Sequence, residues 1–163
     1  MKFRDAIQND LPSIVAIYNS TVAGRMVTAD TSPVSVESRQ QWFDQHTSTK
    51  HPLWMVEDDD NNIIGWVSFQ AFYGRPAYDA TAEISIYLDP LQRGKGYGKK
   101  ILQYCMDNAH RFGITNLLGF IFSHNTPSLQ LFTGLGFEEW GHLKNIAQID
   151  GKEISVTIVG KRL

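Results

Sequence analysis

Apolar positions along the chain recur at two spacings, one typical of helices and one typical of strands. The helical spacing predicts four helices. Three of them start after a residue suited to capping, namely Asp10, Ser35 and Thr126. The fourth follows a glycine-rich turn and is expected to end near Arg111, with Cys105 on its apolar face. Helix-breaking residues between 21 and 33 predict a loop.

Runs rich in β-branched and aromatic residues predict strands. We expect them at residues 2–6, 53–57, 63–72, 80–88, 117–122, 137–149 and 153–159. The turn signals at 58–62 and at Asp150-Gly151 join two pairs of these strands into hairpins. Strands outnumber helices, which favours an α/β protein of the α+β type, with a mixed, mostly antiparallel sheet and helices on its faces.

Composition narrows the class of protein. The 163 residues, 42% of them hydrophobic, suffice for one domain, and no linker divides residues 1–163. A net charge of -2 argues against a nucleic-acid binder. The single cysteine and five histidines lack metal-ligand spacing, so we expect no metal and no disulfide. We also expect no membrane span and, without an apolar signal segment at the start, a cytoplasmic location.

One stretch carries a chemical signal. A β-branched strand ends at Asp89-Pro90, and a loop from Gln92 to Gly98 with three glycines and two cations leads into a helix. Backbone N–H groups and the helix dipole make such a turn an anion site. The spacing matches neither a Walker loop nor a dinucleotide fingerprint, because it places Arg93, Gly96 and Gly98 in an R-x-x-G-x-G pattern.

That pattern resembles the acyl-CoA loop of the GNAT superfamily of N-acyltransferases. The run 83–88 resembles the central strand of that fold, and Asn125-x-x-Ser128 with 135–137 (Leu-Gly-Phe) resembles its C-terminal signature. The run 75–83 (R-x-A-Y-x-x-T-x-E) resembles the phosphinothricin and methionine sulfoximine acetyltransferase branch. The resemblance implies a single GNAT domain with about seven strands and acetyl-CoA as co-substrate.

The resemblance also implies where acetyl-CoA binds. The backbone of the predicted central strand would hold the pantetheine arm, and the loop amides would hold the pyrophosphate. Asn125 would contact the same arm. The alternative is that Asn125 is only a turn residue before a helix. The implied cofactor-binding residues are Ile86, Tyr87, Leu88, Arg93, Gly94, Lys95, Gly96, Tyr97, Gly98, Lys99, Asn125 and Ser128.

Glu83 is the predicted catalytic base. It is a charged residue in a strand that otherwise indicates burial, and desolvation would raise its pKa. A solvent-facing glutamate or a structural ion pair is the alternative, and the residues alone favour neither. A backbone N–H near Tyr87 or Leu88 would supply the oxyanion donor. Phe132 stands where the resemblance would place a proton-donating side chain, so no general acid is assigned.

Arg75 is predicted to clamp a substrate carboxylate, with Tyr78 lining the same pocket. The alternative for Arg75 is a surface charge. Residues 26, 28 and 30 (Met, Thr, Asp) are expected to form the far wall, and Ala29 stands where the branch tends to carry an aromatic residue. These features favour a small amino acid with a tetrahedral side-chain end as acceptor, in preference to phosphinothricin itself.

Other functions stay open at this point. The acceptor is alternatively a peptide N-terminus or an antibiotic amine, and a non-catalytic acetyl-CoA sensor would keep the glycine loop without needing Glu83. The resemblance implies a homodimer that acts on a small-molecule amine. Trp140 and Ile146 are candidates for its apolar contact surface, with a role in the core as the alternative.

Overall fold

A single seven-stranded sheet organises the chain in the computed structural model, which describes all 163 residues. Its strand order is β1-β2-β3-β4-β5-β7-β6. The strands are β1 (Lys2–Asp5), β2 (Leu53–Glu57), β3 (Ile63–Ala71), β4 (Thr81–Leu88), β5 (Asn116–Phe122), β6 (Glu138–Ile149) and β7 (Lys152–Arg162). Only β4 and β5 pair in parallel, so the mixed, mostly antiparallel sheet is confirmed.

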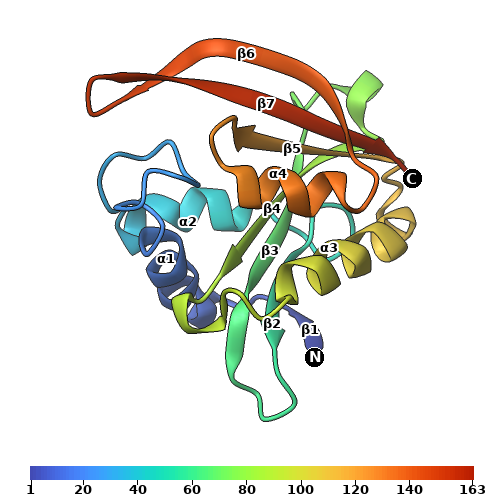
Figure 1. Cartoon of the computed structure of the whole chain (residues 1–163). Helices are drawn as coiled ribbons and strands as arrows, with labels where there is room; N and C mark the ends of the chain where they lie inside the picture. Colours follow the sequence, from blue (N-terminus) through green and yellow to red (C-terminus); the bar gives the residue numbers. More distant parts are fainter.

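Four α-helices cover this sheet. They are α1 (Leu11–Asn19), α2 (Val36–Asp44), α3 (Tyr97–Asn108) and α4 (Thr126–Thr133). Helices α1 and α2 lie on one face of the sheet and α3 on the other, while α4 lies beside β5 and the β6–β7 hairpin (Figure 1). Short 3-10 turns occur at Gln8–Asp10, Pro76–Tyr78, Pro90–Gln92 and Ala109–Phe112. None of the helices combines the length and the apolar character needed to cross a membrane.

The three predicted helix caps have different outcomes. Asp10 stands at the N-cap position of α1 as predicted, but its side chain makes no capping bond. Its carboxylate instead accepts hydrogen bonds from Arg4 Nη1 at 2.6 Å and from the Ile7 N–H at 2.8 Å. Asn125, not Thr126, caps α4: its Oδ1 accepts the N–H of residue 128 at 3.2 Å. The prediction at Ser35 is confirmed, since its Oγ accepts the N–H of residue 38 at 3.2 Å.

Successive side chains of the central strands point to opposite faces of the sheet, so these strands contribute residues to two separate hydrophobic cores. The larger core lies between the sheet and α3, and the smaller lies between the sheet and α1. The larger contains Val67, Phe69, Ala82, Ile84, Ile101, Leu102 and Cys105, and the smaller contains Ile14, Ile17, Leu53, Met55 and Trp66. Strands β3 and β4 are therefore covered on both faces, and the side chains of 83, 85 and 87 point away from α3, toward α1 and α2.

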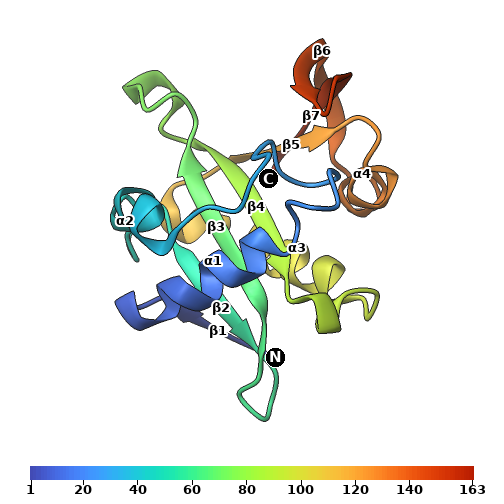
Figure 2. The ribbon, with the colours of Figure 1, turned by 90° about the vertical axis from the view of Figure 1, so that its left-hand side faces the viewer.

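The sheet splits at its parallel pair. Strand β4 pairs with β5 only from Thr81 to Glu83, opposite Asn116 to Leu118, although both strands continue beyond these residues. Past Glu83 the two strands run apart, and β5 turns toward the β6–β7 hairpin (Figure 2). The divergence leaves one edge of β4, from Ile84 to Leu88, without a strand partner in the middle of the sheet.

Candidate active site

A cavity of about 520 Å³ occupies the split between β4 and β5. Its walls come from both strands, from the glycine loop before α3 and from the start of α4. Ten of the twelve residues predicted to bind the cofactor line it: Ile86, Tyr87, Leu88, Arg93, Gly94, Gly96, Gly98, Lys99, Asn125 and Ser128. Lys95 and Tyr97 do not. Lys95 Nζ bonds to Gln92 Oε1 at 3.0 Å, and the Tyr97 side chain packs against the larger core.

The glycine loop leaves its amides free. Gly94 and Gly96 adopt φ angles of 74° and 78°, a left-handed conformation that costs other residues energy. None of the loop and turn hydrogen bonds of the backbone is donated by an amide of residues 93–99, and no side chain caps α3. These N–H groups stand at the positive end of the helix dipole, so the structure offers an anion site at the mouth of the cavity.

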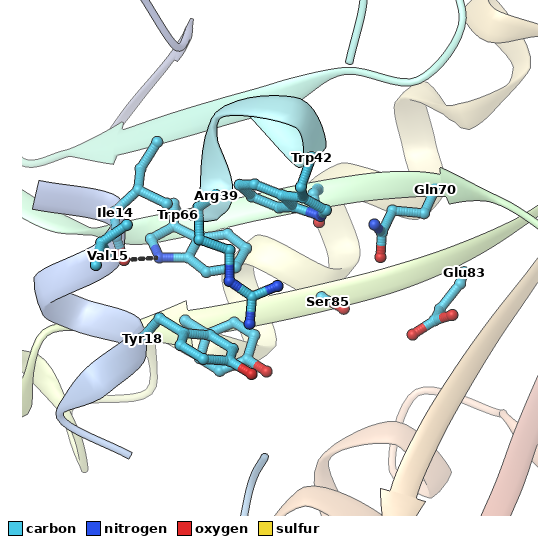
Figure 3. Close-up of a pocket in the computed structure, with 11 residues that line it drawn as sticks. Ile14, Val15, Tyr18, Arg39, Trp42, Trp66, Gln70, Glu83 and Ser85 are labelled. Carbon is cyan, nitrogen blue, oxygen red and sulfur yellow. Dashed lines mark hydrogen bonds between the residues drawn. The ribbon is translucent and has the colours of Figure 1, made fainter. Parts of the chain in front are cut away.

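A second cavity, of about 200 Å³, lies on the other side of β4. Its floor consists of three cross-strand pairs between β3 and β4, which are Trp66 with Tyr87, Ser68 with Ser85, and Gln70 with Glu83. Helices α1 and α2 form its walls (Figure 3). Residues 85 and 87 line both cavities, so the two adjoin across β4.

Aromatic packing and one hydrogen bond hold the apolar end of this floor in place. The rings of Trp66 and Tyr87 stack with their centroids 4.5 Å apart. The Trp66 indole N–H donates to the Ile14 carbonyl at 3.1 Å, which ties β3 to α1 (Figure 3). Burial raises the pKa of Tyr87, so its hydroxyl stays protonated at neutral pH.

Glu83 lies at the polar end of the smaller cavity, at the last residue that joins β4 to β5. It is half-buried and has no ion-pair partner in the chain, which argues against the structural ion pair considered from the sequence. Burial alone raises its pKa, because removal from water disfavours the carboxylate form. A carboxylate whose pKa is raised is a stronger base than an exposed one, which suits it to accept a proton.

A hydrogen-bonded network closes the smaller cavity. Tyr18 donates its hydroxyl proton to Asp30 and also contacts Thr28. Arg39 Nη2 donates to Asp30 Oδ2 at 2.6 Å, and its guanidinium lies 4.6 Å from the centroid of the Tyr18 ring. Thr28 and Asp30, expected in the far wall, thus lie behind Tyr18 and Arg39, which line the cavity directly.

The loop that carries this network also contacts the larger cavity. Asn125 Nδ2 donates to the Met26 carbonyl at 2.8 Å, while the same side chain caps α4. Arg25 forms an ion pair with Asp150 at 2.8 Å, in the turn of the β6–β7 hairpin. The segment between α1 and α2 is therefore anchored to the C-terminal half of the chain.

Arg75 and Tyr78, the two predicted substrate-binding residues, lie outside both cavities of this chain. Arg75 is exposed in the segment between β3 and β4, and Tyr78 is 43% exposed beside Phe72. Neither lines either cavity of this chain, so their substrate contacts stay a prediction. Phe132 is buried in the wall of the larger cavity, with its ring 4.9 Å from that of Phe137, and it has no proton to donate.

Sequence reasoning assigned only Glu83 and Tyr87 among the residues that line the smaller cavity. The polar and aromatic residues that it missed include Arg39, Trp42, Ser68, Gln70 and Ser85. The floor had a readable signal, because polar residues alternate along 66–70 and along 83–87 at the strand period. The wall had none. Arg39 belongs to a helix with several charged and polar residues, which resembles a solvent-facing segment.

Comparison with known proteins agrees with this architecture. A family model described as "Acetyltransferase (GNAT) domain" matches residues 3–158. The Bacillus subtilis protein named "Putative phosphinothricin acetyltransferase YwnH" is 52% identical over 100% of this chain and 99% of its own. The "L-methionine sulfoximine/L-methionine sulfone acetyltransferase" of Pseudomonas aeruginosa is 32% identical over 96% of this chain and 91% of its own.

A solved structure adds the co-substrate. The phosphinothricin acetyltransferase of Sinorhizobium meliloti, crystallised in complex with acetyl-CoA, superposes with a TM-score of 0.90. It is 30% identical, and the match covers 99% of this chain and 88% of that one.

Proposed function

The chain belongs to the GNAT acetyltransferase family, and from that premise we propose that its acceptor is the α-amine of a small amino acid or analogue. The enzyme is an N-acetyltransferase with acetyl-CoA as co-substrate. The proposed acceptors carry a tetrahedral side-chain end, as methionine sulfone, methionine sulfoximine and phosphinothricin do. Relatives named for these compounds support the proposal.

We assign acetyl-CoA to the larger cavity, whose residues fit it. The free amides between Arg93 and Lys99 suit the pyrophosphate. The pantetheine arm carries amide groups, and the unpaired edge of β4 from Ile86 to Leu88 offers it backbone partners as a neighbouring strand would. This path leads the thioester toward the point where β4 leaves β5, beside Glu83.

Glu83 is the proposed general base. The acceptor amine is largely an ammonium ion at neutral pH and must lose a proton before it attacks. Glu83 takes that proton directly or through a water molecule. The nitrogen then adds to the acetyl carbonyl carbon to give a tetrahedral intermediate with an oxyanion. When the carbonyl re-forms, the carbon–sulfur bond breaks, CoA leaves as a thiolate, and the second proton of the nitrogen is lost to that thiolate or to water. The backbone N–H of Leu88, which faces the unpaired edge of β4, stabilises the oxyanion of the intermediate.

One observation carries this proposal: two cavities adjoin across β4, and the smaller contains a half-buried, unpaired glutamate. Its volume of about 200 Å³ is below the 300–1,000 Å³ typical of drug-sized ligand sites. Helices α1 and α2 enclose it. The cavity therefore favours a single amino acid over a peptide N-terminus.

An acceptor panel tests the proposal. Release of free CoA thiol is measured with methionine sulfone, methionine sulfoximine and phosphinothricin, and with dipeptide and aminoglycoside amines for comparison. We expect thiol release with the amino acids and little with the larger amines. Thiol release only with dipeptides or aminoglycosides would refute the assignment of the acceptor.

The same assay tests Arg75. Arg75→Ala should raise the KM for the amino acid and leave the KM for acetyl-CoA unchanged, because the predicted clamp contacts only the acceptor. Equal changes in both KM values would contradict the clamp. Lys144→Ala, an exposed cation of β6, is the matched control.

We also propose a homodimer, as the family resemblance implies. A core role for Trp140 and Ile146 is ruled out, since they are 49% and 63% exposed on β6. Light scattering coupled to size-exclusion chromatography tests the dimer, with Ile146→Glu as the variant expected to give monomers. A monomeric wild-type mass would refute the proposal.

A further inference from the structure

The floor of the smaller cavity holds polar side chains that the chain itself does not satisfy. Ser68 is 0% exposed, and its hydroxyl has no hydrogen-bond partner. The partly buried side chains of Glu83, Ser85 and Gln70 have no hydrogen-bond partner in the chain either. Buried polar groups in folded proteins nearly always have partners. This row is therefore complementary to a polar ligand that runs along β3 and β4.

Arg39 stands opposite this row as the only cation that lines the cavity (Figure 3). Asp30 and the face of Tyr18 fix its orientation, and its side chain is 27% exposed. A guanidinium has five N–H donors, and the contact with Asp30 uses one of them. The remaining four are pre-positioned donors with no partner in the chain.

The position of Arg39 separates it from the reacting amine. Its guanidinium lies over Tyr18, whose ring packs 5.2 Å from that of Tyr87, whereas Glu83 lies at the other end of the floor. The Cα atoms of residues 83 and 87, which mark the two ends of the floor along β4, are about 13 Å apart.

A small amino acid bridges that length. The amine and the terminal oxygens of a sulfone side chain are about 6 Å apart when extended. One hydrogen bond of about 2.9 Å at each end brings the reach to about 12 Å. An acceptor with its amine at Glu83 therefore presents its side-chain end, and not its amine, to Arg39.

We propose that Arg39 is the specificity-determining residue of the acceptor site and binds the terminal oxygens of the acceptor side chain, be they of a sulfone, sulfoximine or phosphinate. This assignment rests on the proposed function and adds the group that selects the tetrahedral end. The fork of donors on a guanidinium matches two oxygens on one central atom, as it matches carboxylate and phosphate.

The test compares two acceptors that differ only at that end. Methionine sulfone and methionine share the amine, the carboxylate and the carbon chain, but only the sulfone has the two oxygens. We expect Arg39→Gln to lower kcat/KM for methionine sulfone about 10- to 100-fold, the range for loss of a charge-assisted hydrogen bond. The kcat/KM for methionine should change less than about threefold, and the KM for acetyl-CoA should not change.

Controls separate recognition from a structural role. Arg39→Lys keeps the ion pair with Asp30 and should recover part of the sulfone selectivity, and it also serves if the glutamine variant fails to fold. Gln41→Ala, at an exposed position of α2, should match the wild type. A loss that is equal for both acceptors would mean that Arg39 binds the carboxylate or supports the fold, and would overturn the proposal.

The outcomes distinguish this assignment from the proposed function. Wild-type activity with unchanged selectivity in Arg39→Gln overturns the role of Arg39 alone. Absence of thiol release from the wild type with every amino acid overturns the proposed function and this assignment with it.

Discussion

Replacement of Glu83 by glutamine separates chemistry from binding. The substitution keeps the size of the side chain and removes its ionisable carboxyl group. Glu83 has no ion-pair partner, so the exchange breaks no salt bridge. It does not line the larger cavity, so acetyl-CoA binding should not depend on it.

The expected loss is that of a general base, about 10²- to 10⁴-fold in kcat. At 1.36 kcal/mol for each factor of ten, this corresponds to about 3–5 kcal/mol of transition-state free energy. The KM for acetyl-CoA should stay at the wild-type value. Wild-type activity should rise with pH as Glu83 deprotonates, through a pKa that burial raises above the ordinary value, and the variant should lack this dependence.

The Glu83→Gln substitution should raise the stability of the folded protein at neutral pH, although it lowers the activity. A folded-state pKa above the unfolded value means that the folded protein binds the proton more tightly. The stability of the wild type therefore falls as pH rises from the ordinary glutamate pKa, about 4.3, through the raised one. Glu83→Gln should melt at a higher temperature than the wild type at pH 7, and this advantage should shrink at pH 4.

Steady-state thiol-release kinetics and thermal melts at both pH values check these expectations. Glu139→Gln, at an exposed position of β6, is the matched control and should behave as the wild type. Near-wild-type turnover in Glu83→Gln would refute the role as a base. A drop in turnover together with a lower melting temperature would show that the side chain supports the fold instead.

Three further substitutions test the elements around the site. Gly96→Ala places a side chain at a φ of 78°, a strain of about 1–2 kcal/mol, and should raise the Kd for acetyl-CoA measured by calorimetry; an unchanged Kd would contradict the anion site. Arg4→Met leaves the Asp10 carboxylate without its ion pair and should cost about 1–3 kcal/mol in urea unfolding at pH 7. Hydrogen bonds from Arg4 lower the pKa of Asp10, so this stabilisation is present above the ordinary pKa and is lost as pH falls; the difference from wild type should shrink at pH 3. Asn125→Ala removes the α4 cap and the hydrogen bond to the Met26 carbonyl, and should cost about 1–3 kcal/mol in the same assay. Asn125→Asp keeps a capping oxygen but has no donor for Met26, so it should recover only part of that loss.

Local patterns predicted the elements well because their causes are local. The strand expected at 53–57 has those bounds in the structure, and the turn expected at Asp150-Gly151 joins β6 and β7. Both residues of that turn have positive φ, which Gly and Asp tolerate better than most. The glycine loop was equally visible, since its signal is contained within residues 92–98.

Contacts between distant parts of the chain decided what the sequence did not show. Asp10 has the chemistry of a helix cap, but its carboxylate binds Arg4 on β1. The position of Arg4 depends in turn on the pairing of β1 with the distant strand β2, where Glu57 binds the same guanidinium. Arg39 reaches the cavity because α2 packs on α1. There its guanidinium lies over the ring of Tyr18 and binds the carboxylate of Asp30, which belongs to the segment between the two helices. No periodicity in residues 21–35 predicts that these three side chains lie in contact.

The location of the proposed chemistry follows from where the sheet splits. Pairing between β4 and β5 ends at Glu83, so the free backbone edge begins at the next residue. Successive side chains of a strand point to opposite faces, which sends the Glu83 carboxyl toward α1 and α2 while the edge of β4 opens on the larger cavity. A thioester held along that edge therefore comes within reach of a base that never has to enter the cofactor cavity. The buried Ser68 hydroxyl, which has no hydrogen-bond partner, and the unpaired Glu83 lie along the same floor, where the polar groups of a bound acceptor would supply partners for them.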